Sequence, residues 1–513
     1  MPTALIFGVL ASAVAVYAYS LWRQHASNPR NLPYPPGPGP HFLLGNLHDL
    51  PAKGNRWLEY QRLSETYGSD VIHLTVLGTH ILSINSQQAA NDLLEKRSAI
   101  YSDRPRMPML KELIGWDWNL VVMSYSEGFA AHRRLVQQSF QPNVVAKLHR
   151  PVMQREVLTL LHNLLNSPEN FMSHLKTMAG AIIMMVTYGY QIDLEDDPFV
   201  RLAEDVRDRD ERFSAGNLVD VLPILKFVPS WFPGAAFKRE ALYSRQLAAQ
   251  MRDAPYLMVK KRLAVGTALP SMIGSLIEEK FSNESTITDD LIKNCGGVVY
   301  SAGADTTVAA LANFFLAMTL YPSVQDCAQR ELDETIGRDR LPDFDDRARL
   351  PSLDCLVKEV LRWKPVAALG VPHCTTADDE YRGMFIPKGT IVLANIYAML
   401  HDESVYKDPD AFSPERFKRR SDGSGIAPDP ASASFGFGRR ICPGRFFATD
   451  SLWIAIANIL HVFRLSKAMD SRGRVIEPDV TWSSGLVSMP SHFPCGVEPR
   501  FIGAEGLLLE TAG

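Results

Sequence analysis

The sequence predicts one large domain that is mainly α-helical with a small β part, an α+β fold. Apolar residues recur at helical spacing over 152–166 and 175–188, and residues 289–320 form an apolar run without proline. β-Branched residues and turn signals predict short strands within 74–85 and 371–394. The 513 residues, which show no internal repeat, suffice for one large domain or for two or three ordinary ones.

The first element is an apolar segment, Ala4 to Trp22, that contains no charged residue. As a helix it would span roughly 28 Å, about the thickness of one hydrocarbon core. Arg23 and Arg30 follow the segment and no Lys or Arg precedes it, which places the rest of the chain in the cytosol. We expect a single-pass membrane anchor over residues 1–22; a cleaved signal peptide is the alternative.

A proline-rich run, LPYPPGPGP, follows at residues 32–40. Prolines at this density exclude a helix and favour stiff, extended backbone. We therefore expect residues 23–40 to form a linker and a hinge, which orients the remaining domain, residues 41–513, against the membrane.

Prolines also mark the ends of two predicted helices. Pro322 ends a helix over 289–320, which is much longer than an average helix. Pro351 opens and Pro365 stops a second helix over 352–363.

Charge and cysteine usage exclude several classes of protein. The formal net charge is −4, so nothing suggests a nucleic acid as partner. The six cysteines are scattered and include no CxxC pair. This is typical of reduced thiols in a cytosol-facing chain, and not of a disulfide framework or a zinc site.

The most specific segment is the run FGFGRRICPG at residues 435–444. A thiolate such as that of Cys442 can be the axial ligand of a haem iron and can favour cleavage of a bound O–O bond. The glycines let the backbone approach a flat macrocycle, and Arg439 and Arg440 can pair with anionic propionates. The alternative is a buried structural cysteine in a glycine-rich turn.

This run resembles the haem-binding signature of the cytochrome P450 family, F-x-x-G-x-R-x-C-x-G. It matches the five fixed positions at Phe435, Gly438, Arg440, Cys442 and Gly444. The resemblance extends over nearly the whole chain, in the order of the family's motifs. It implies the cytochrome P450 fold, with a single haem-thiolate catalytic domain over 41–513, haem b as cofactor and Cys442 as the ligand of its iron.

A second motif, AGADTT, lies at residues 302–307 in the long predicted helix. Small side chains let a flat ligand approach the helix, and a threonine hydroxyl that bonds to a carbonyl one turn earlier can bend it. Heterolytic cleavage of O₂ needs protons, which a hydroxyl beside a carboxylate can relay. The motif matches the family pattern A/G-G-x-D/E-T-T/S, which implies that Asp305 and Thr306 are the catalytic pair. A helix kink without chemistry is the alternative.

Glu359 and Arg362 are three residues apart on one predicted helix face, and Arg416 follows in the segment PERF. Their order resembles the Glu-Arg-Arg cluster of the family, which supports the haem pocket structurally. We expect these residues to be structural and not catalytic.

The resemblance also implies partners for the haem propionates: Arg440, His373 in the strand region and Arg133. Here the chain departs from the family, because Phe129 and Ala130 replace the Trp and Arg of its W-R-x-x-R pattern. We expect one or two propionate contacts to be missing, with His132, Arg133 or Arg134 in their place.

Other functional segments carry less pattern. Pocket-lining candidates are 101–121, 213–231, 366–371 and 483–487. The apolar loop 229–233 is either core or dips into the membrane. Basic residues near the cysteine segment are either a solvated surface or a docking patch for an acidic reductase: Lys418, Arg419, Arg420, Arg439 and Arg445.

The resemblance implies a fungal monooxygenase that inserts one oxygen atom from O₂ into a small lipophilic substrate, such as a terpenoid of secondary metabolism. Its electrons would come from NADPH through NADPH-cytochrome P450 reductase, with cytochrome b5 as a second candidate donor, at the endoplasmic reticulum membrane. A haem-thiolate isomerase or dehydratase and a non-enzymatic haem sensor are the alternatives. The intact Asp305-Thr306 pair argues against both.

Overall fold

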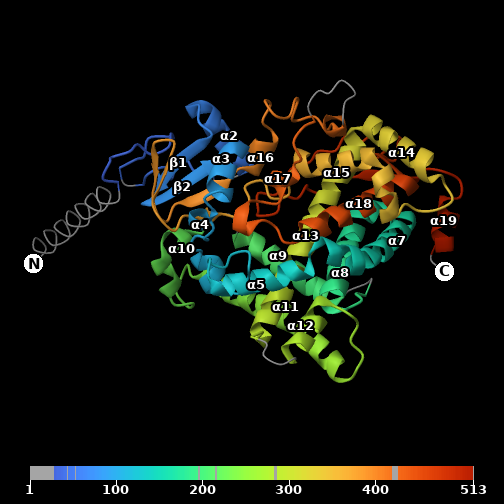
Figure 1. The fold of residues 1–513 in the computed structure, drawn as a ribbon, viewed down its shortest axis with the longest axis horizontal. Coiled ribbons are helices and arrows are strands. Elements are labelled where there is room, and N and C mark those ends of the chain that lie inside the picture. Colours follow the sequence, from blue (N-terminus) through green and yellow to red (C-terminus); the bar gives the residue numbers. More distant parts are fainter. Residues whose placement is uncertain are drawn as a thin grey trace, which may run out of the picture.

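The structure is a computed structural model of the chain. It describes residues 28–511 except 43, 52–53, 194–196, 214–216, 282–285 and 419–425. Helices make up most of the described residues (Figure 1). Three small sheets are also present, which confirms the predicted α+β class. The predicted anchor over residues 1–22 lies outside the described residues.

The described chain contains helices of three kinds. The longer α-helices are α2 (Arg56–Tyr67), α5 (Glu127–Ser139), α7 (Arg150–Asn166), α8 (Phe171–Tyr188), α9 (Pro198–Phe213), α11 (Ala236–Ala264), α12 (Met272–Phe281), α13 (Asp289–Leu320), α14 (Pro322–Ile336), α15 (Pro351–Trp363) and α18 (Arg445–Val462). The shorter ones are α3 (Gln87–Ala90), α4 (Ser98–Tyr101), α6 (Pro142–Val144), α10 (Leu218–Val221), α16 (Ile396–Leu400), α17 (Ala431–Ser434) and α19 (Ala504–Thr511). Short π-helices are η1 (Asn91–Glu95), η2 (Pro108–Leu113) and η3 (Val145–His149). Short 3₁₀-helices are η4 (Pro168–Asn170), η5 (Pro223–Phe227), η6 (Phe344–Arg349), η7 (Pro414–Phe417) and η8 (Gly438–Arg440).

The main sheet has the strand order β1-β2-β6-β3. Strand β1 (Val71–Val76) pairs antiparallel with β2 (Thr79–Ile84), β2 runs parallel to β6 (Ile391–Ala394), and β3 (His373–Cys374) is antiparallel to β6. Both predicted strand regions are therefore present. Two further pairs are β4 (Asp379–Tyr381) with β5 (Met384–Ile386) and β7 (Phe463–Lys467) with β8 (Cys495–Pro499).

Helix α13 has the predicted bounds for local reasons. The Thr288 hydroxyl accepts a hydrogen bond from the Leu291 N–H at 3.1 Å, and two aspartates in the first turn complement the helix dipole. At its other end Pro322 begins α14. Helix α13 packs against α8, α11, α15 and α18 and forms the centre of the core (Figure 1). Within the described residues it is the one helix with the length and apolarity to span a membrane, but 72% of its apolar window is buried.

Helix α15 carries the predicted charged cluster. Glu359 and Arg362 are both fully buried and form two hydrogen bonds of 2.8 Å, while Arg416 of η7 donates to Glu359 at 3.2 Å. The Arg362 guanidinium also donates to the carbonyls of Leu400 and Ala411 at 3.0 Å. The charges therefore have the partners that their burial requires, and the cluster fastens η7 to α15.

The proline-rich run lies against β1. The Tyr34 ring stacks on the His73 ring at 4.8 Å, and the His73 N–H donates to the Pro36 carbonyl at 2.9 Å. The Gly37 position requires glycine, because a Cβ there would lie 2.0 Å from the His73 carbonyl oxygen. The second half of the predicted hinge is thus fixed on the domain.

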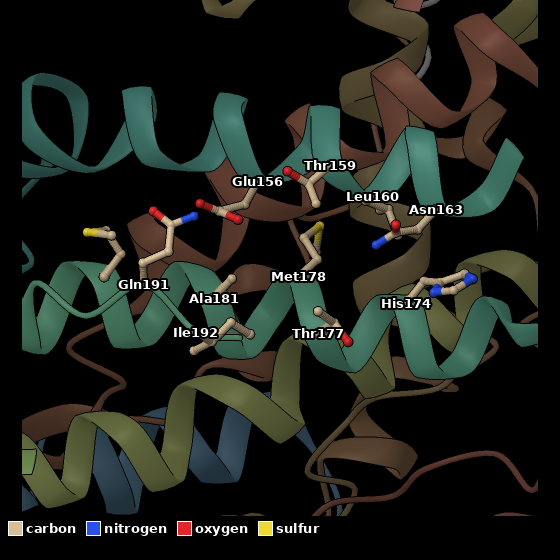
Figure 2. Close-up of a pocket in the computed structure, with 11 residues that line it drawn as sticks. Glu156, Thr159, Leu160, Asn163, His174, Thr177, Met178, Ala181, Gln191 and Ile192 are labelled. Atoms are coloured by element: carbon tan, nitrogen blue, oxygen red, sulfur yellow. The ribbon is translucent and has the colours of Figure 1, made fainter. Parts of the chain in front are cut away.

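A small cavity of about 140 Å³ lies between α7 and α8. Figure 2 shows Glu156 and Thr159 of α7 facing Met178 and Ala181 of α8 across it. Its lining includes no residue of the 302–307 motif or of the cysteine segment. We therefore regard it as a packing gap between two core helices and not as the candidate site.

Candidate active site

The cysteine segment, residues 435–444, is a tight loop that contains η8 and ends at the start of α18. Its ends are tied by the Cys442 N–H, which donates to the Phe435 carbonyl at 2.8 Å. Gly438 has a φ of 55°, and a Cβ there would lie 2.2 Å from the Leu94 carbonyl oxygen, so only glycine fits. Gly444 caps α18, whose first turn therefore begins beside Cys442.

The Cys442 thiol is surrounded by positive groups. Burial raises its pKa, whereas the Gly444 amide and the guanidiniums of Arg133 and Arg445 lower it. Burial outweighs these positive groups and raises the pKa overall, so the thiolate is disfavoured as an isolated charge. A metal cation at the sulfur is the partner that such a site needs.

The middle of α13 has accessible surface within an otherwise buried helix. Residues 294–300 and 307–319 are buried, whereas Ala302 is exposed and its neighbours up to Thr306 are half-buried. We call residues 301–306 the open turn. Its small side chains leave room beside the helix in the centre of the molecule.

Thr306 lies in the open turn as the motif predicts. Its hydroxyl donates to the Ala302 carbonyl at 2.8 Å, and the next hydroxyl, of Thr307, donates to the Gly303 carbonyl at 3.2 Å. These bonds fix the Thr306 side chain at the surface of the turn.

Asp305 is bound to another helix. Its Oδ1 accepts a hydrogen bond from the Arg207 guanidinium of α9 at 3.3 Å. Burial raises the pKa of Asp305, and Arg207 lowers it. The sequence analysis missed Arg207, because nothing in the local sequence of α9 indicates which of its several arginines faces α13.

The buried Arg104 lies close to Arg440, a half-buried arginine of the cysteine segment. Arg440 donates to the carbonyls of Ser102 and Met123 at 2.8 Å, and its guanidinium lies 3.7 Å from the Phe129 ring centroid. Arg104 is 6% exposed and donates to three other backbone carbonyls. Within the described chain, neither guanidinium forms an ion pair with a carboxylate. The sequence analysis missed Arg104, which lies in the segment it assigned to the pocket.

His373 lies beside these two arginines. Its Nδ1–H donates to the Tyr101 carbonyl at 2.7 Å, so Nε2 is protonated only in the charged form. Burial, with help from Arg104 and Arg440, lowers the pKa of His373 to about 3. A carboxylate placed between Arg104, Arg440 and His373 would raise the pKa of His373 again, because it neutralises the arginines and attracts a proton to Nε2.

Phe129 and Ala130, which replace the Trp and Arg of the family's W-R-x-x-R pattern, change the contacts around Arg440. Phe129 packs on Arg440 by a cation–π contact, where an indole would also have offered an N–H. His132 does not replace the lost contacts, because its ring nitrogens bond to the Gly128 carbonyl at 2.7 Å and to Asn294 at 3.1 Å. Arg133 lies close to Cys442 and Arg445, and burial lowers its pKa.

These side chains fit an iron porphyrin. Cys442 offers a soft ligand for iron, and the two unpaired guanidiniums of Arg104 and Arg440, with His373, suit two carboxylates. The open turn of α13 leaves surface for a flat ligand. The donor set and the charges therefore agree with haem as the resident cofactor.

Comparison with known proteins decides the family. The sequence profile of the family described as "Cytochrome P450" matches residues 35–493. The chain belongs to the cytochrome P450 family. A cytochrome P450 monooxygenase of Armillaria gallica is 40% identical, over 97% of this chain and 98% of its own. Cytochrome P450 monooxygenase 208 of Postia placenta is 42% identical, over 93% and 92% of the two chains, and claR of Ampulloclitocybe clavipes is 41% identical, over 92% and 88%.

This P450 is accordingly a haem-thiolate monooxygenase, as the sequence analysis expected. Family membership implies haem b as cofactor, a small-molecule substrate and a redox partner.

The surface of the P450 beside Cys442 carries a hollow of about 630 Å³. Four arginines line it, and none forms an ion pair with a carboxylate within the described residues: Arg133, Arg134, Arg439 and Arg445. Among these four, the sequence analysis had named Arg439 and Arg445 as docking candidates. Of its remaining candidates, Lys418 pairs with Glu415 at 2.7 Å, while 419–420 lie outside the described residues. We call the four arginines that line the hollow, Arg133, Arg134, Arg439 and Arg445, the arginine rim.

Proposed function

We propose that this P450 inserts one oxygen atom from O₂ into a small lipophilic substrate of fungal secondary metabolism, such as a terpenoid. The observation that carries the proposal is the open turn of α13, where Thr306 and Asp305 meet accessible surface in the core. An isomerase or a haem sensor has no need for such a hydroxyl–carboxylate pair. The relatives named above are fungal monooxygenases, which supports the same class.

The residues that would hold the haem follow from the site. Cys442 provides the thiolate for the iron, and the loop around it is shaped by Phe435, Gly438 and Gly444. The two propionate carboxylates of the haem would be held by Arg440, Arg104, His373 and Arg133. When bound, the haem supplies the redox chemistry by which O₂ gives one oxygen atom to the substrate and the other to water.

Asp305 and Thr306 supply protons to this chemistry. Burial raises the pKa of Asp305, so its carboxyl group holds a proton more readily than an exposed aspartate. Arg207 limits this rise and keeps the side chain at α9. The Thr306 Oγ1 lies on the open turn and would pass the proton from the carboxyl group toward O₂, whose cleavage needs protons.

Electrons come from NADPH through NADPH-cytochrome P450 reductase, with cytochrome b5 as a second donor. The arginine rim supports this proposal, since Arg134, Arg439 and Arg445, which the haem does not use, are unpaired cations beside the cysteine segment and suit an acidic partner surface. The hollow brings that partner close to Cys442, which shortens the path for electrons.

The P450 is anchored in the endoplasmic reticulum membrane by residues 1–22, with its domain in the cytosol. An apolar surface over 218–232 supports contact with lipid: Ile224, Phe227 and Trp231 are each more than 70% exposed. The alternative that loop 229–233 belongs to the core is wrong, because Phe232 is also 50% exposed.

Turnover under ¹⁸O₂ tests the proposal. The P450, its reductase and NADPH are incubated with a panel of terpenoids, and products are analysed by mass spectrometry. We expect products that carry one ¹⁸O atom from the gas, and none without reductase. Products that form without O₂, or that carry oxygen from water, would instead favour the isomerase or dehydratase alternative.

A further inference from the structure

A third cation lies beside Arg104 and Arg440. Lys111, in η2, is half-buried, and its ammonium group donates to the Ser124 hydroxyl at 3.3 Å. Ser124 directly follows Met123, whose carbonyl accepts a hydrogen bond from Arg440 at 2.8 Å. Within the described residues, Lys111 forms no ion pair with a carboxylate. No motif of the sequence includes this lysine.

All three cations bind to one short stretch of chain, residues 120–124. Arg104 donates to the Val121 carbonyl at 2.8 Å, and Arg440 donates to the carbonyls of residues 120 and 123. Lys111 binds the side chain of residue 124. These partners are neutral oxygen atoms, which satisfy N–H groups but do not cancel their charge. The stretch therefore gathers three positive charges.

One carboxylate lies among the three cations. Oδ1 of Asp103 accepts hydrogen bonds from the backbone N–H groups of Arg104 and Tyr125 at 2.8 Å. Burial lowers the pKa of all three cations, and Asp103 opposes this only in part. Asp117 also acts on Lys111, but it is exposed, and its effect on the pKa is the smallest of the charges nearby. The cluster thus keeps an excess of two positive charges.

Helix α5 offers no replacement for the cation that is lost at Ala130. His132 is bonded within the core. Arg133 is the arginine that the family's pattern retains, and the Cys442 sulfur, which is anionic as an iron ligand, lies close to it. Arg134 is exposed and lines the hollow on the surface. A replacement must therefore come from another element.

The charges of the cluster match those of the cofactor. Haem b carries two propionates, and Arg104 and Arg440 with Asp103 leave only one positive charge to balance them. Lys111 supplies the second. We propose that Lys111 pairs with a haem propionate and so replaces the cation that is missing at position 130. The inference rests on the proposed function, whose cofactor site it completes.

Haem retention by the full-length holoenzyme tests this proposal. The ferric protein is mixed with excess apomyoglobin, and the change in absorbance gives the rate of haem transfer. Lys111→Met keeps the length of the side chain but removes its charge. We expect haem transfer to become roughly tenfold faster, the effect of one lost charge-assisted hydrogen bond. Lys111→Arg, which keeps the charge, should restore the wild-type rate.

The reduction potential of the haem iron separates a charge role from a packing role. A cation beside a propionate favours the reduced iron, so Lys111→Met should shift the potential to a more negative value. Ser124→Ala removes the hydrogen bond that fixes Lys111 to the loop but leaves the ammonium group, so it should keep the wild-type rate and potential. If Lys111 only fastens η2 to residue 124, Ser124→Ala should reproduce the effects of Lys111→Met, which would overturn the proposal.

Lys388→Met provides the matched control. Lys388 is exposed in the turn between β5 and β6, and its replacement changes the net charge equally. Both the haem transfer and the potential should stay at their wild-type values. A Lys111→Met protein with the wild-type rate or potential contradicts the proposal, as do changes that Lys111→Arg does not reverse or that Lys388→Met reproduces.

The carbon monoxide spectrum separates this proposal from the proposed function. A thiolate spectrum in the wild type, without an effect of Lys111→Met, would remove the propionate contact alone. A wild type that binds no haem would remove the proposed function and this inference with it.

Discussion

Thr306 and Thr319 make the same local bond in α13, since each hydroxyl donates at 2.8 Å to the carbonyl four residues earlier. Thr306 lies in the open turn, whereas Thr319 is buried. We predict that Thr306→Ala lowers product per NADPH about a hundredfold, with peroxide formed instead, because a proton donor is lost. Thr319→Ala should keep the wild-type ratio. Assays of the NADPH consumed and of the peroxide and product formed measure this ratio. An unchanged ratio of product to NADPH in Thr306→Ala would refute the proton role.

Arg207 and Asp305 form an ion pair whose loss should depend on pH. Removing Arg207 raises the pKa of Asp305 further, because burial then acts unopposed by that cation. Near pH 7 the ionised carboxylate is left without its partner, and Arg207→Leu should lose about 1–2 kcal/mol of unfolding free energy, less than a fully buried pair. As the pH falls through the raised pKa, Asp305 becomes neutral and the loss should shrink.

Denaturant unfolding near pH 7 and about pH 5 measures this loss. The double variant Arg207→Leu/Asp305→Asn should regain most of the stability, because no charge remains unpaired. A deficit that is equal at both pH values, or that the second change does not relieve, would mean that Arg207 acts through packing instead.

Some residues of the site can be assigned from the sequence alone, and others cannot. Cys442 and Arg440 belong to one short loop, so their spacing alone brings them together, and Thr306 and Asp305 are adjacent on a helix. Arg104 and Arg207 reach the site from distant segments by tertiary packing. No local pattern marks them, which is why the sequence analysis did not assign them.

At the scale of elements, the Glu359 cluster holds α15 to η7. Glu359 accepts hydrogen bonds from Arg362, Arg416 and the Ser413 N–H, and its side chain is fully buried. We predict that Glu359→Gln lowers the unfolding free energy by about 3–5 kcal/mol, because buried guanidiniums lose their counter-charge. Denaturant unfolding and the haem content after purification measure the effect.

The exposed ion pair between Lys358, on the same helix, and Asp429, in the segment before α17, provides the control. Its atoms are 3.5 Å apart and its side chains are 38% and 52% exposed. Asp429→Asn should change stability by less than about 0.5 kcal/mol. Equal losses from Glu359→Gln and Asp429→Asn would contradict the structural role of the cluster.

The elements that the sequence predicted best have strong local signals. Helix α13 begins at a threonine cap and ends before Pro322, and α15 lies between Pro351 and Pro365. The pair β7–β8 was not predicted, because residues 468–494 separate its two strands and no short turn joins them. Its register depends on tertiary structure rather than on turn residues.

At the scale of the molecule, the apolar surface over 218–232 and the C-terminal helix α19 lie at opposite sides (Figure 1). We predict that a protein starting at residue 28 still binds lipid vesicles through this surface. Replacing Ile224, Phe227 and Trp231 by Ser should weaken that binding at least tenfold, because each buries apolar area worth roughly 1.5–3 kcal/mol when fully inserted. Vesicle flotation measures the bound fraction.

The fully exposed Ile502, near α19, serves as the matched control. Ile502→Ser should leave flotation unchanged, since that side faces away from the proposed membrane contact. If the triple variant floats as well as the wild type, the apolar surface has another role, and membrane attachment would then depend on the segment before residue 28.

The account as a whole depends on Cys442 as the ligand of the haem iron. The most direct measurement is the absorption spectrum of the reduced protein with carbon monoxide, for the wild type and for Cys442→Ser. We predict the strongly red-shifted Soret band of thiolate-ligated iron in the wild type and its loss in Cys442→Ser. A wild type without that band, or a band that persists in the variant, would contradict the assignment of the site.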